Sequence, residues 1–170
     1  GGALADGDNN VAIGASAMAS DTDGQGSTAV GTSALGSQNI TSEGLTRNTG
    51  LGYQSGLYNQ TGTHNTYVGY RSGFGAVNQS NGYNTAVGTD SLTAITTGSY
   101  NTVMGNAAGD AMTSQANCVL IGMNAGSSIN NDDANGTTIV GRDAGESLTE
   151  GQYNTVMGYN ALNANQTGND

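Results

Sequence analysis

Catalytic chemistry has few side chains to draw on in this sequence of 170 residues. His64 is the only histidine and Cys118 the only cysteine, so a Ser–His–Asp or Cys–His arrangement could exist at one site at most. His64 also occupies a position at which other copies of the repeat described below have tyrosine, which indicates a positional role. A polysaccharide-cleaving site would need two carboxylates in one groove, for which the candidates are Asp90, Asp110, Asp143 and Glu146. We therefore expect that the protein is not an enzyme and binds no cofactor.

Acidic turns offer the only candidate metal chemistry. Residues 131–136, Asn-Asp-Asp-Ala-Asn-Gly, resemble the start of a calcium-binding loop, whose ligands are carboxylate and amide oxygens. The twelfth position, where such a loop has a bidentate glutamate, is Arg142. The fragments 6–8 and 21–24 are acidic in a similar way but lack the other ligands. Calcium remains an alternative, a solvated acidic turn is the preferred interpretation, and no metal site is predicted.

Rows of tyrosine are the best candidate for binding chemistry. Tyr83 and Tyr100 hold one position of the repeat in adjacent copies, and Tyr53 and Tyr70 hold another. Stacked copies would place such rings about 4.8 Å apart. Aromatic faces beside amides and carboxylates can bind sugar rings. The predicted ligand surface comprises Tyr53, Tyr70, Tyr83, Tyr100, Tyr153 and Tyr159. The alternative is that these rings only pack between neighbouring copies and stiffen the assembly.

All of these positions belong to one repeat, which is anchored on a glycine. Nine copies have their anchors at Gly14, Gly31, Gly52, Gly69, Gly88, Gly105, Gly122, Gly141 and Gly158. Successive anchors are 17, 21, 17, 19, 17, 17, 19 and 17 residues apart, so the base period is 17 with insertions of two or four. The residue before each anchor is aliphatic, the residue three before it is Thr or Val, and the residue three after it is Ala or Ser.

The repeat predicts short strands and no helix. A β-branched residue and an aliphatic residue two positions apart, closed by glycine, are typical of a short β-strand. Gly and Asn recur too often for helices, and no 3.6-residue stripe lasts two turns. One strand per 17 residues predicts an all-β, parallel β-solenoid of about nine coils of 17–21 residues. The asparagine that often stands four before the anchor is expected to form a ladder of side-chain amides.

Both faces of these strands are apolar, which predicts self-association. The predicted structural core is the aliphatic row Ile13, Val30, Leu51, Val68, Val87, Met104, Ile121, Val140 and Met157. The residue between Thr and this aliphatic would then face outward, yet it is apolar from Ala12 to Val156. A strand that is apolar on both faces is buried on both. We therefore expect a second copy of the chain to cover the outer face.

Charge and composition exclude several classes of protein. Thirteen acidic residues and three basic ones give a net charge of −10, the wrong sign for binding nucleic-acid phosphates. No apolar run approaches the roughly 20 residues of a membrane span, so no membrane insertion is expected. With 29 glycines, no proline and 9% charged residues, the chain is neither collagen nor a typical disordered segment. Its start, Gly1-Gly2 with no initiator methionine or signal peptide, suggests a mature product or a fragment.

Two copies of the repeat resemble the head repeats of trimeric autotransporter adhesins. These are residues 10–17, N-V-A-I-G-A-S-A, and 27–34, S-T-A-V-G-T-S-A. Residues 83–88, Y-N-T-A-V-G, and 153–158, Y-N-T-V-M-G, are more similar to related repeats of phage tail-fibre proteins. The resemblance implies a left-handed β-roll in which three chains wind about one axis. The adhesin repeat is shorter than this one, so its binding surface is not transferred.

The sequence as a whole predicts an extracellular fibre module. We expect a homotrimeric segment of a phage tail fibre that makes multivalent contacts with a host cell-surface glycan or protein. The head of a bacterial adhesin is the first alternative, and an ice-binding solenoid with regular threonine rows is the second. The expected organisation is a lead-in over residues 1–8, one repeat domain over 9–164 and a tail over 165–170.

Overall fold

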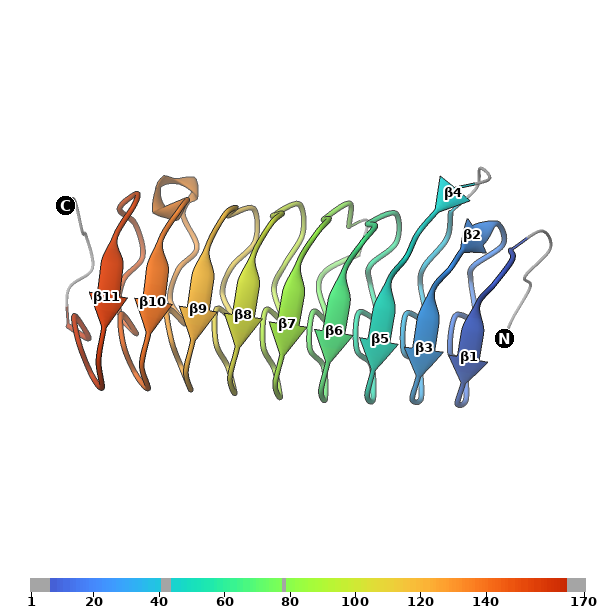
Figure 1. Cartoon of the computed structure of the whole chain (residues 1–170), viewed down its shortest axis with the longest axis horizontal. Coiled ribbons are helices and arrows are strands. Elements are labelled where there is room, and N and C mark those ends of the chain that lie inside the picture. Colours follow the sequence, from blue (N-terminus) through green and yellow to red (C-terminus); the bar gives the residue numbers. More distant parts are fainter. Residues whose placement is uncertain (1–6, 41–43, 78, 165–170) are drawn as a thin grey trace.

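The computed structural model describes residues 7–40, 44–77 and 79–164 and places them in one elongated coil (Figure 1). Nine strands form one parallel sheet: β1 (Val11–Ile13), β3 (Thr28–Val30), β5 (Thr49–Leu51), β6 (Thr66–Val68), β7 (Thr85–Val87), β8 (Thr102–Met104), β9 (Val119–Ile121), β10 (Thr138–Val140) and β11 (Thr155–Met157). A separate parallel pair joins β2 (Gly24–Gln25) and β4 (Gly44–Leu45). The predicted parallel β-solenoid is confirmed, with about eight turns between the first and last strands of the nine-stranded sheet.

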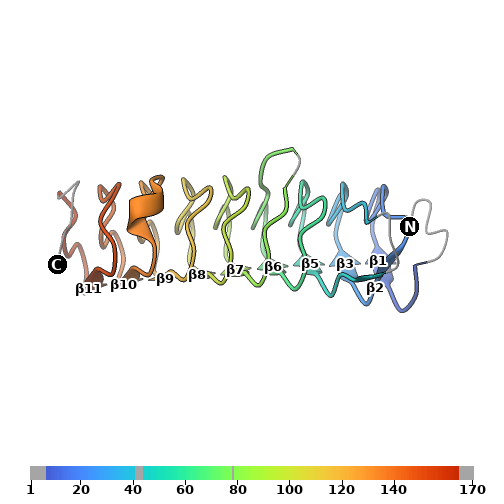
Figure 2. The same ribbon diagram turned by 90° about the horizontal axis from the view of Figure 1, so that it is seen from above.

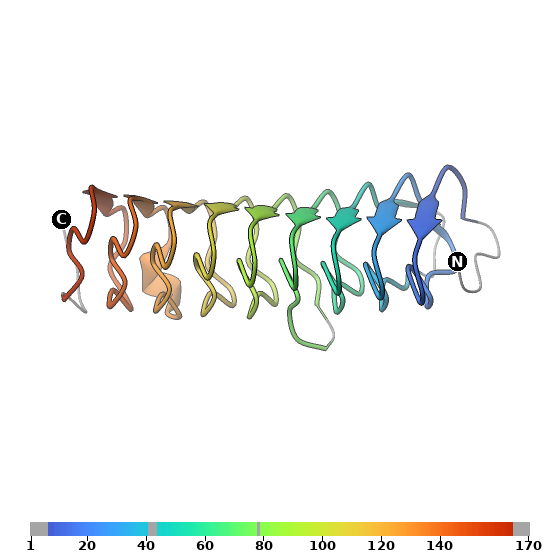
Figure 3. The ribbon, with the colours of Figure 1, turned by 90° about the horizontal axis from the view of Figure 1, so that it is seen from below.

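Each position of the repeat stacks on its own copy in the next coil. Where β5 pairs with β6, for example, Thr49 faces Thr66 and Leu51 faces Val68. The insertions leave this register intact because they bulge out between strands. The segment between β6 and β7 bulges away from the strands in both Figure 2 and Figure 3. The only helix of the described residues, the 3₁₀ turn η1 (Asp132–Ala134), lies between β9 and β10.

The anchor glycines allow the coils to approach closely. All nine have φ between 117° and 142°, a conformation that L-residues avoid. A Cβ atom on Gly88 would lie 2.7 Å from the carbonyl carbon of Gly105 in the next coil. Two further positions, two and four after each anchor, also have positive φ in every coil, from 48° to 61°. The tight turn after each strand therefore depends on glycine at one point and tolerates other residues at the next two.

The interior of the coil is not the row predicted from the sequence. The nine aliphatic residues before the anchors are half-buried or exposed, up to 59% at Ile13 and 70% at Met157. The residue between Thr and this aliphatic points inward instead, and from Ala29 to Val156 it is buried in every coil. The prediction was therefore wrong for Ile13, Val30, Leu51, Val68, Val87, Met104, Ile121, Val140 and Met157. The alternation of side chains along a strand assigns these residues to two opposite faces. It does not determine which of two apolar faces points into the coil.

Inside the coil, a large side chain at one inward position is matched by a small residue at another. Where the inward strand residue is large, as at Leu120 or Ile139, glycine stands four after the anchor. A Cβ atom on Gly109 would lie 2.8 Å from the Leu120 side chain, so that glycine makes room for it. Where the inward residue is Ala29, the fourth position is the buried Leu35. These two inward rows thus exchange size from coil to coil, as residues that share one enclosed space must do.

The third inward row changes from polar to apolar along the rod. It lies seven after the anchor and is buried throughout the described coils that lack the bulge. In the first three coils it is Asp21, Gln38 and Asn59, whereas in later ones it is Ile95, Met112, Ile129 and Leu148. The polar residues are linked by hydrogen bonds: Gln38 Nε2 donates to Asp21 Oδ2 at 2.6 Å, and Asn48 Nδ2 donates to Gln38 Oε1 at 2.9 Å. For Asp21 and Gln38, these bonds replace the contacts with water that burial removes, whereas the buried Asn59 Oδ1 has no partner among the described residues.

The predicted asparagine ladder exists, but its partners are mostly main-chain groups. Asn65 is representative: its Oδ1 accepts from the Asn84 amide at 2.9 Å, and its Nδ2 donates to the Asn81 carbonyl at 3.1 Å. The same pair of bonds recurs at Asn84 and Asn101. A direct amide-to-amide bond is added between Asn101 Nδ2 and Asn84 Oδ1, at 3.0 Å. Each asparagine therefore ties two coils together and satisfies buried backbone groups.

A second wall, formed by the residues about six to eight after each anchor, runs along the coil behind the strands. Its coils are also hydrogen-bonded to each other: the Ser37 amide donates to Leu57 and the Asn39 amide to Gln60, both at 2.9 Å. Among the described residues, no helix has the length and apolar character to cross a membrane.

Replacing Gly88 with alanine tests the close approach of the coils. We expect Gly88→Ala to lower the free energy of unfolding by about 2–5 kcal/mol, because it adds both backbone strain and a clash. Gly26→Asn is the control: Gly26 has φ 74°, and a Cβ atom there meets nothing closer than 3.7 Å. It should change stability by less than about 1 kcal/mol. Urea denaturation measures both variants, and equal losses would contradict the role of the anchors.

Candidate functional site

Two rows of side chains cover the outer face of the nine-stranded sheet. One is the threonine row and the other is the aliphatic row, and both run in register along the rod. Five consecutive strands present threonine, from Thr28 to Thr102. No charged residue occurs in either row. These two rows, here called the outer face, form a continuous, uncharged and partly apolar strip.

Tyrosine rows flank this outer face on both sides. Tyr83 and Tyr100, five before their anchors, stack with ring centroids 5.0 Å apart and planes 7° from parallel. Tyr53 and Tyr70, one after their anchors, stack at 5.5 Å and 8°. The stacking predicted from the repeat is therefore confirmed. All four rings are about half exposed, between 47% and 60%, so a ligand can reach them.

His64 and Arg47 extend the first tyrosine row; the sequence analysis placed His64 at this position but did not identify Arg47. The His64 ring stacks on Tyr83 with centroids 4.7 Å apart and planes 11° from parallel. Arg47 belongs to the preceding coil, and its Nη1 lies 3.2 Å from His64 Nε2. A continuous row, Arg47–His64–Tyr83–Tyr100, therefore spans four coils. The signal was available, because all four residues stand five before an anchor.

The backbone of this row disfavours the side chains that occupy it. All nine residues five before an anchor have φ between 50° and 74°. Glycine or asparagine, the residue types that adopt this conformation most readily, occupies it in four coils, at Asn9, Gly26, Asn117 and Gly136. Arginine, histidine or tyrosine there costs about 1–2 kcal/mol relative to glycine. Non-glycine residues adopt a similar φ two and four after the anchors, so this cost is a general feature of the coil.

The last two predicted tyrosines do not stack on another tyrosine. Tyr153 and Tyr159 lie in the last described coil and are 75% and 72% exposed. The Tyr153 ring covers Gly136, whose added Cβ atom would lie 2.8 Å from the ring. The Arg142 guanidinium lies 5.8 Å from the Tyr159 ring centroid, within range of a cation–π contact.

The acidic turns form local hydrogen bonds. Asn131 caps η1 through its side chain, which accepts from the Asp133 amide at 3.1 Å. Asp132 accepts a hydrogen bond from Ser114, and Asn131 Nδ2 donates to Glu150 at 3.2 Å. Within residues 7–40, 44–77 and 79–164, no three His, Cys, Asp or Glu side chains gather as a metal site would require. Part of the fragment 6–8 lies outside the described residues.

The carboxylates considered for catalysis are separately engaged. Asp90 lies 3.6 Å from Arg71, and Asp143 lies 3.0 Å from Arg142. Glu146 accepts from Asn163 Nδ2 at 3.2 Å. Burial raises the pKa of Asp110, and the nearby charge of Asp90 adds to that rise. A raised carboxyl pKa is a property of general acids, but here it has an ordinary cause in desolvation. The absence of enzyme activity stays a prediction.

Cys118 replaces asparagine in the ladder and is buried. Its amide donates to Asn101 Oδ1 at 3.0 Å, and its thiol lies 3.4 Å from the Ala134 carbonyl. Burial raises the pKa of the Cys118 thiol, which disfavours the nucleophilic thiolate. The residue therefore acts as a small interior side chain, as its place in the repeat predicts.

Comparison with known proteins adds no relative: no family model, no curated protein and no solved structure matches the chain. The interpretation therefore depends on the rows of side chains described above.

Asp110→Asn tests the effect of burial on this carboxylate. The charged form is disfavoured in the folded state, so its protonated form is the more stabilising one. That stability is present below the usual carboxyl pKa of 3.8 and is lost as the pH rises through the raised value. We expect Asp110→Asn to raise Tm by about 1–3 °C at neutral pH and to leave it unchanged well below pH 3.8.

Asp143→Asn is the control, because it removes a carboxylate that Arg142 and Asn124 hold. It should give no gain at neutral pH. A scanning-calorimetry series across pH measures both variants, and an equal gain for both would point to overall negative charge rather than to burial of Asp110.

Proposed function

We propose that the chain is a structural and adhesive fibre module, in which three copies pack their outer faces together and display the tyrosine rows to a host surface. The observation that carries this proposal is the aliphatic row, which remains exposed along the length of the single chain. Half-exposed aliphatic residues recur in every coil, about 4.8 Å apart, over roughly 40 Å. A continuous apolar strip of this kind typically marks an interaction surface.

A second copy of the same chain fits this strip better than an unrelated partner. The strip has the same period along its whole length, so identical rods can align coil against coil. Because the outer face carries no charged residue, chains with a net charge of −10 can meet there without bringing like charges together. Each coil presents a single such face, which favours a closed ring of rods about a common axis. Three copies are proposed from the resemblance to trimeric adhesin heads.

Such an assembly would keep the tyrosine rows near its surface. The rows flank the outer face on either side, so the rings remain accessible at the margins of the contact. Three rods would present three copies of each row on one stiff axis. Many weak contacts of this kind give strong attachment without a deep pocket. A host cell-surface glycan or protein is the proposed partner, and the proposed location is extracellular.

Between the two carriers, we favour a phage tail fibre over a bacterial adhesin head. Tyr-Asn-Thr begins three of the copies, at Tyr83, Tyr100 and Tyr153, and this form is the more similar to tail-fibre repeats.

Ice binding is a second candidate, favoured by one observation. The threonines from Thr28 to Thr102 lie on the outer face in register, which is the arrangement an ice-binding surface would need. The neighbouring row is aliphatic rather than a second row of threonine, which supports the fibre proposal instead.

Val87→Asp tests self-association through the outer face. We expect light scattering to give about three chains per particle for the wild type. Val87→Asp should weaken association at least tenfold, because an interface would bury its new charge. Ala94→Asp, in the same coil but on the second wall and similarly half-buried, should leave the mass unchanged.

A wild-type chain that stays monomeric at high concentration would overturn the fibre proposal. If that monomer also shows thermal hysteresis, the ice-binding candidate replaces it.

The double substitution Tyr83→Asn and Tyr100→Asn tests the tyrosine rows. Asparagine is found at this position and φ in Asn117, so the change removes two rings without straining the backbone. On an array of bacterial lipopolysaccharides and capsular glycans, we expect binding to fall at least tenfold. Gly26→Asn, in the same row but without loss of a ring, is the control. Unchanged binding by the double variant would mean that the rings only stiffen the rod.

A further inference from the structure

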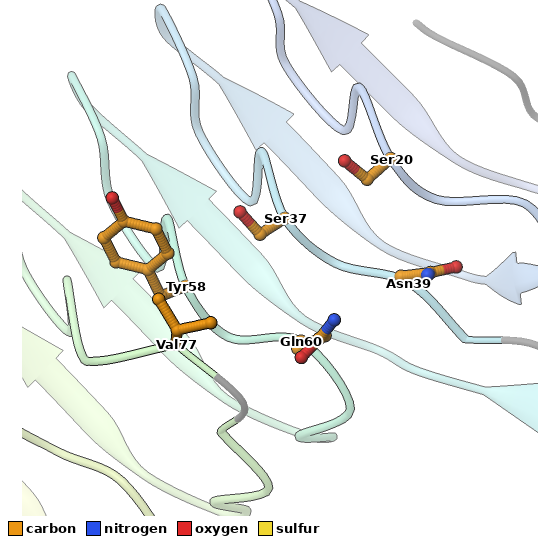
Figure 4. A pocket seen from close by; sticks show the side chains of 6 residues that line it. All are labelled: Ser20, Ser37, Asn39, Tyr58, Gln60 and Val77. Atoms are coloured by element: carbon orange, nitrogen blue, oxygen red, sulfur yellow. The ribbon is translucent and has the colours of Figure 1, made fainter.

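A separate groove lies on the second wall, away from the outer face. It crosses the first coils, has a volume of about 210 Å³, and is lined by Ser20, Ser37, Asn39, Tyr58, Gln60 and Val77 (Figure 4). Two rows of the repeat build it. Ser20, Ser37 and Tyr58 stand six after their anchors, and Asn39 and Gln60 stand eight after theirs. Val77 belongs to the segment between β6 and β7, which bulges away from the strands (Figure 2).

The polar groups of this groove have no side-chain partner among the residues that the structure describes. The hydroxyls of Ser20 and Ser37 and the amides of Asn39 and Gln60 make no side-chain hydrogen bond to any described residue. In some other coils, the residues six and eight after the anchor are of other types or have hydrogen-bond partners.

Threonines eight after the anchor in other coils use their hydroxyls on the next coil: Thr22 donates to Ile40 at 3.1 Å, and Thr96 to Thr113 at 3.0 Å. Six after the anchor, the next coils have Ala94 and Ala111, and only Ser128 and Ser147 near the other end are polar again. The groove is therefore distinguished by the aromatic ring of Tyr58 beside these polar side chains, since polar residues recur in the same rows at Ser128, Asn130 and Ser147.

An aromatic ring forms one wall of the groove and is held in place from behind. Tyr58 packs edge-on against Phe74, with ring centroids 5.0 Å apart and planes 85° apart. The Arg71 guanidinium in turn lies 4.4 Å from the Phe74 ring centroid. Beside Tyr58, the 68% exposed Val77 adds an apolar surface (Figure 4). The groove thus pairs one apolar, aromatic side with a floor of hydrogen-bonding groups.

The residues that line the groove are uncharged, which disfavours charged ligands. No carboxylate, arginine or histidine lines the groove, although the chain carries a net charge of −10. An anion would be repelled by the overall charge and would find no cation here, and a cation would find no carboxylate. The complementary ligand is neutral, carries several hydroxyl groups, and has one apolar face. A pyranose ring has these properties.

We infer that this groove binds one neutral sugar residue, with the ring lying against Tyr58 and Val77 and its hydroxyls bonded to Ser37, Asn39 and Gln60. Like groups in neighbouring coils are about 4.8 Å apart, close to the separation of oxygens on alternate carbons of a pyranose. Sugar rings commonly stack on aromatic side chains in this way. The inference concerns a site separate from the tyrosine rows and requires no self-association of the chain.

Saturation-transfer NMR on the full chain tests the groove, with glucose, galactose and mannose as probes at millimolar concentration. We expect at least one of these hexoses to bind saturably. Ser37→Trp fills the groove and should weaken that binding at least tenfold. Ser147→Trp, at the same position of the repeat in the eighth coil, should leave it unchanged. Gln60→Leu should weaken it about three- to tenfold, because one hydrogen bond is lost.

Three outcomes would overturn the inference: no saturable binding of any of the three hexoses, equal binding by Ser37→Trp and the wild type, or binding lost only with Tyr83→Asn and Tyr100→Asn. The last result would leave the proposed function intact and move the sugar to the tyrosine rows. A chain that is monomeric yet binds a hexose in the groove would instead defeat the fibre proposal and leave this inference standing.

Discussion

The close, in-register contact between successive coils is the constraint on which the rest of the structure depends. Because the backbones meet at the anchor glycines, each residue stacks on its own counterpart one turn away. The repeat thereby becomes a set of rows, and each row has one environment along the rod. Asparagines tie coils together, tyrosines stack with tyrosines, and the aliphatic row becomes a continuous strip. The order of residues within one copy of the repeat therefore determines the order of the rows across the surface of the rod.

Much of this could be predicted from the sequence. The glycine spacing and the Thr-x-aliphatic-Gly motif are sufficient for a parallel solenoid, and identical positions in adjacent copies are sufficient for the stacking of Tyr83 on Tyr100. The inward face was predicted incorrectly because both faces of the strand are apolar. The exchange of size between Leu120 and Gly109 would have shown it, since only residues that share an enclosed space need to compensate for each other.

The two candidate binding features differ in how they could be found. The tyrosine rows follow the period, so a comparison of the copies reveals them. The groove depends on departures from the period: Tyr58 and Gln60 differ from their counterparts, and Val77 belongs to an insertion. The path of an inserted segment is decided by packing in three dimensions, which an alignment of the repeat copies does not contain. Regular rows suit repeated contacts, and the irregular groove suits one specific contact.

The two ends of the rod differ in the polarity of their interior. Its first coils enclose the hydrogen-bonded Asp21 and Gln38, whereas its later coils enclose Ile129 and Leu148. Apolar side chains can collapse in many arrangements, but buried amides and carboxylates are stable only once every partner is in place. The first coils therefore depend on the correct placement of their neighbours more than the later coils do.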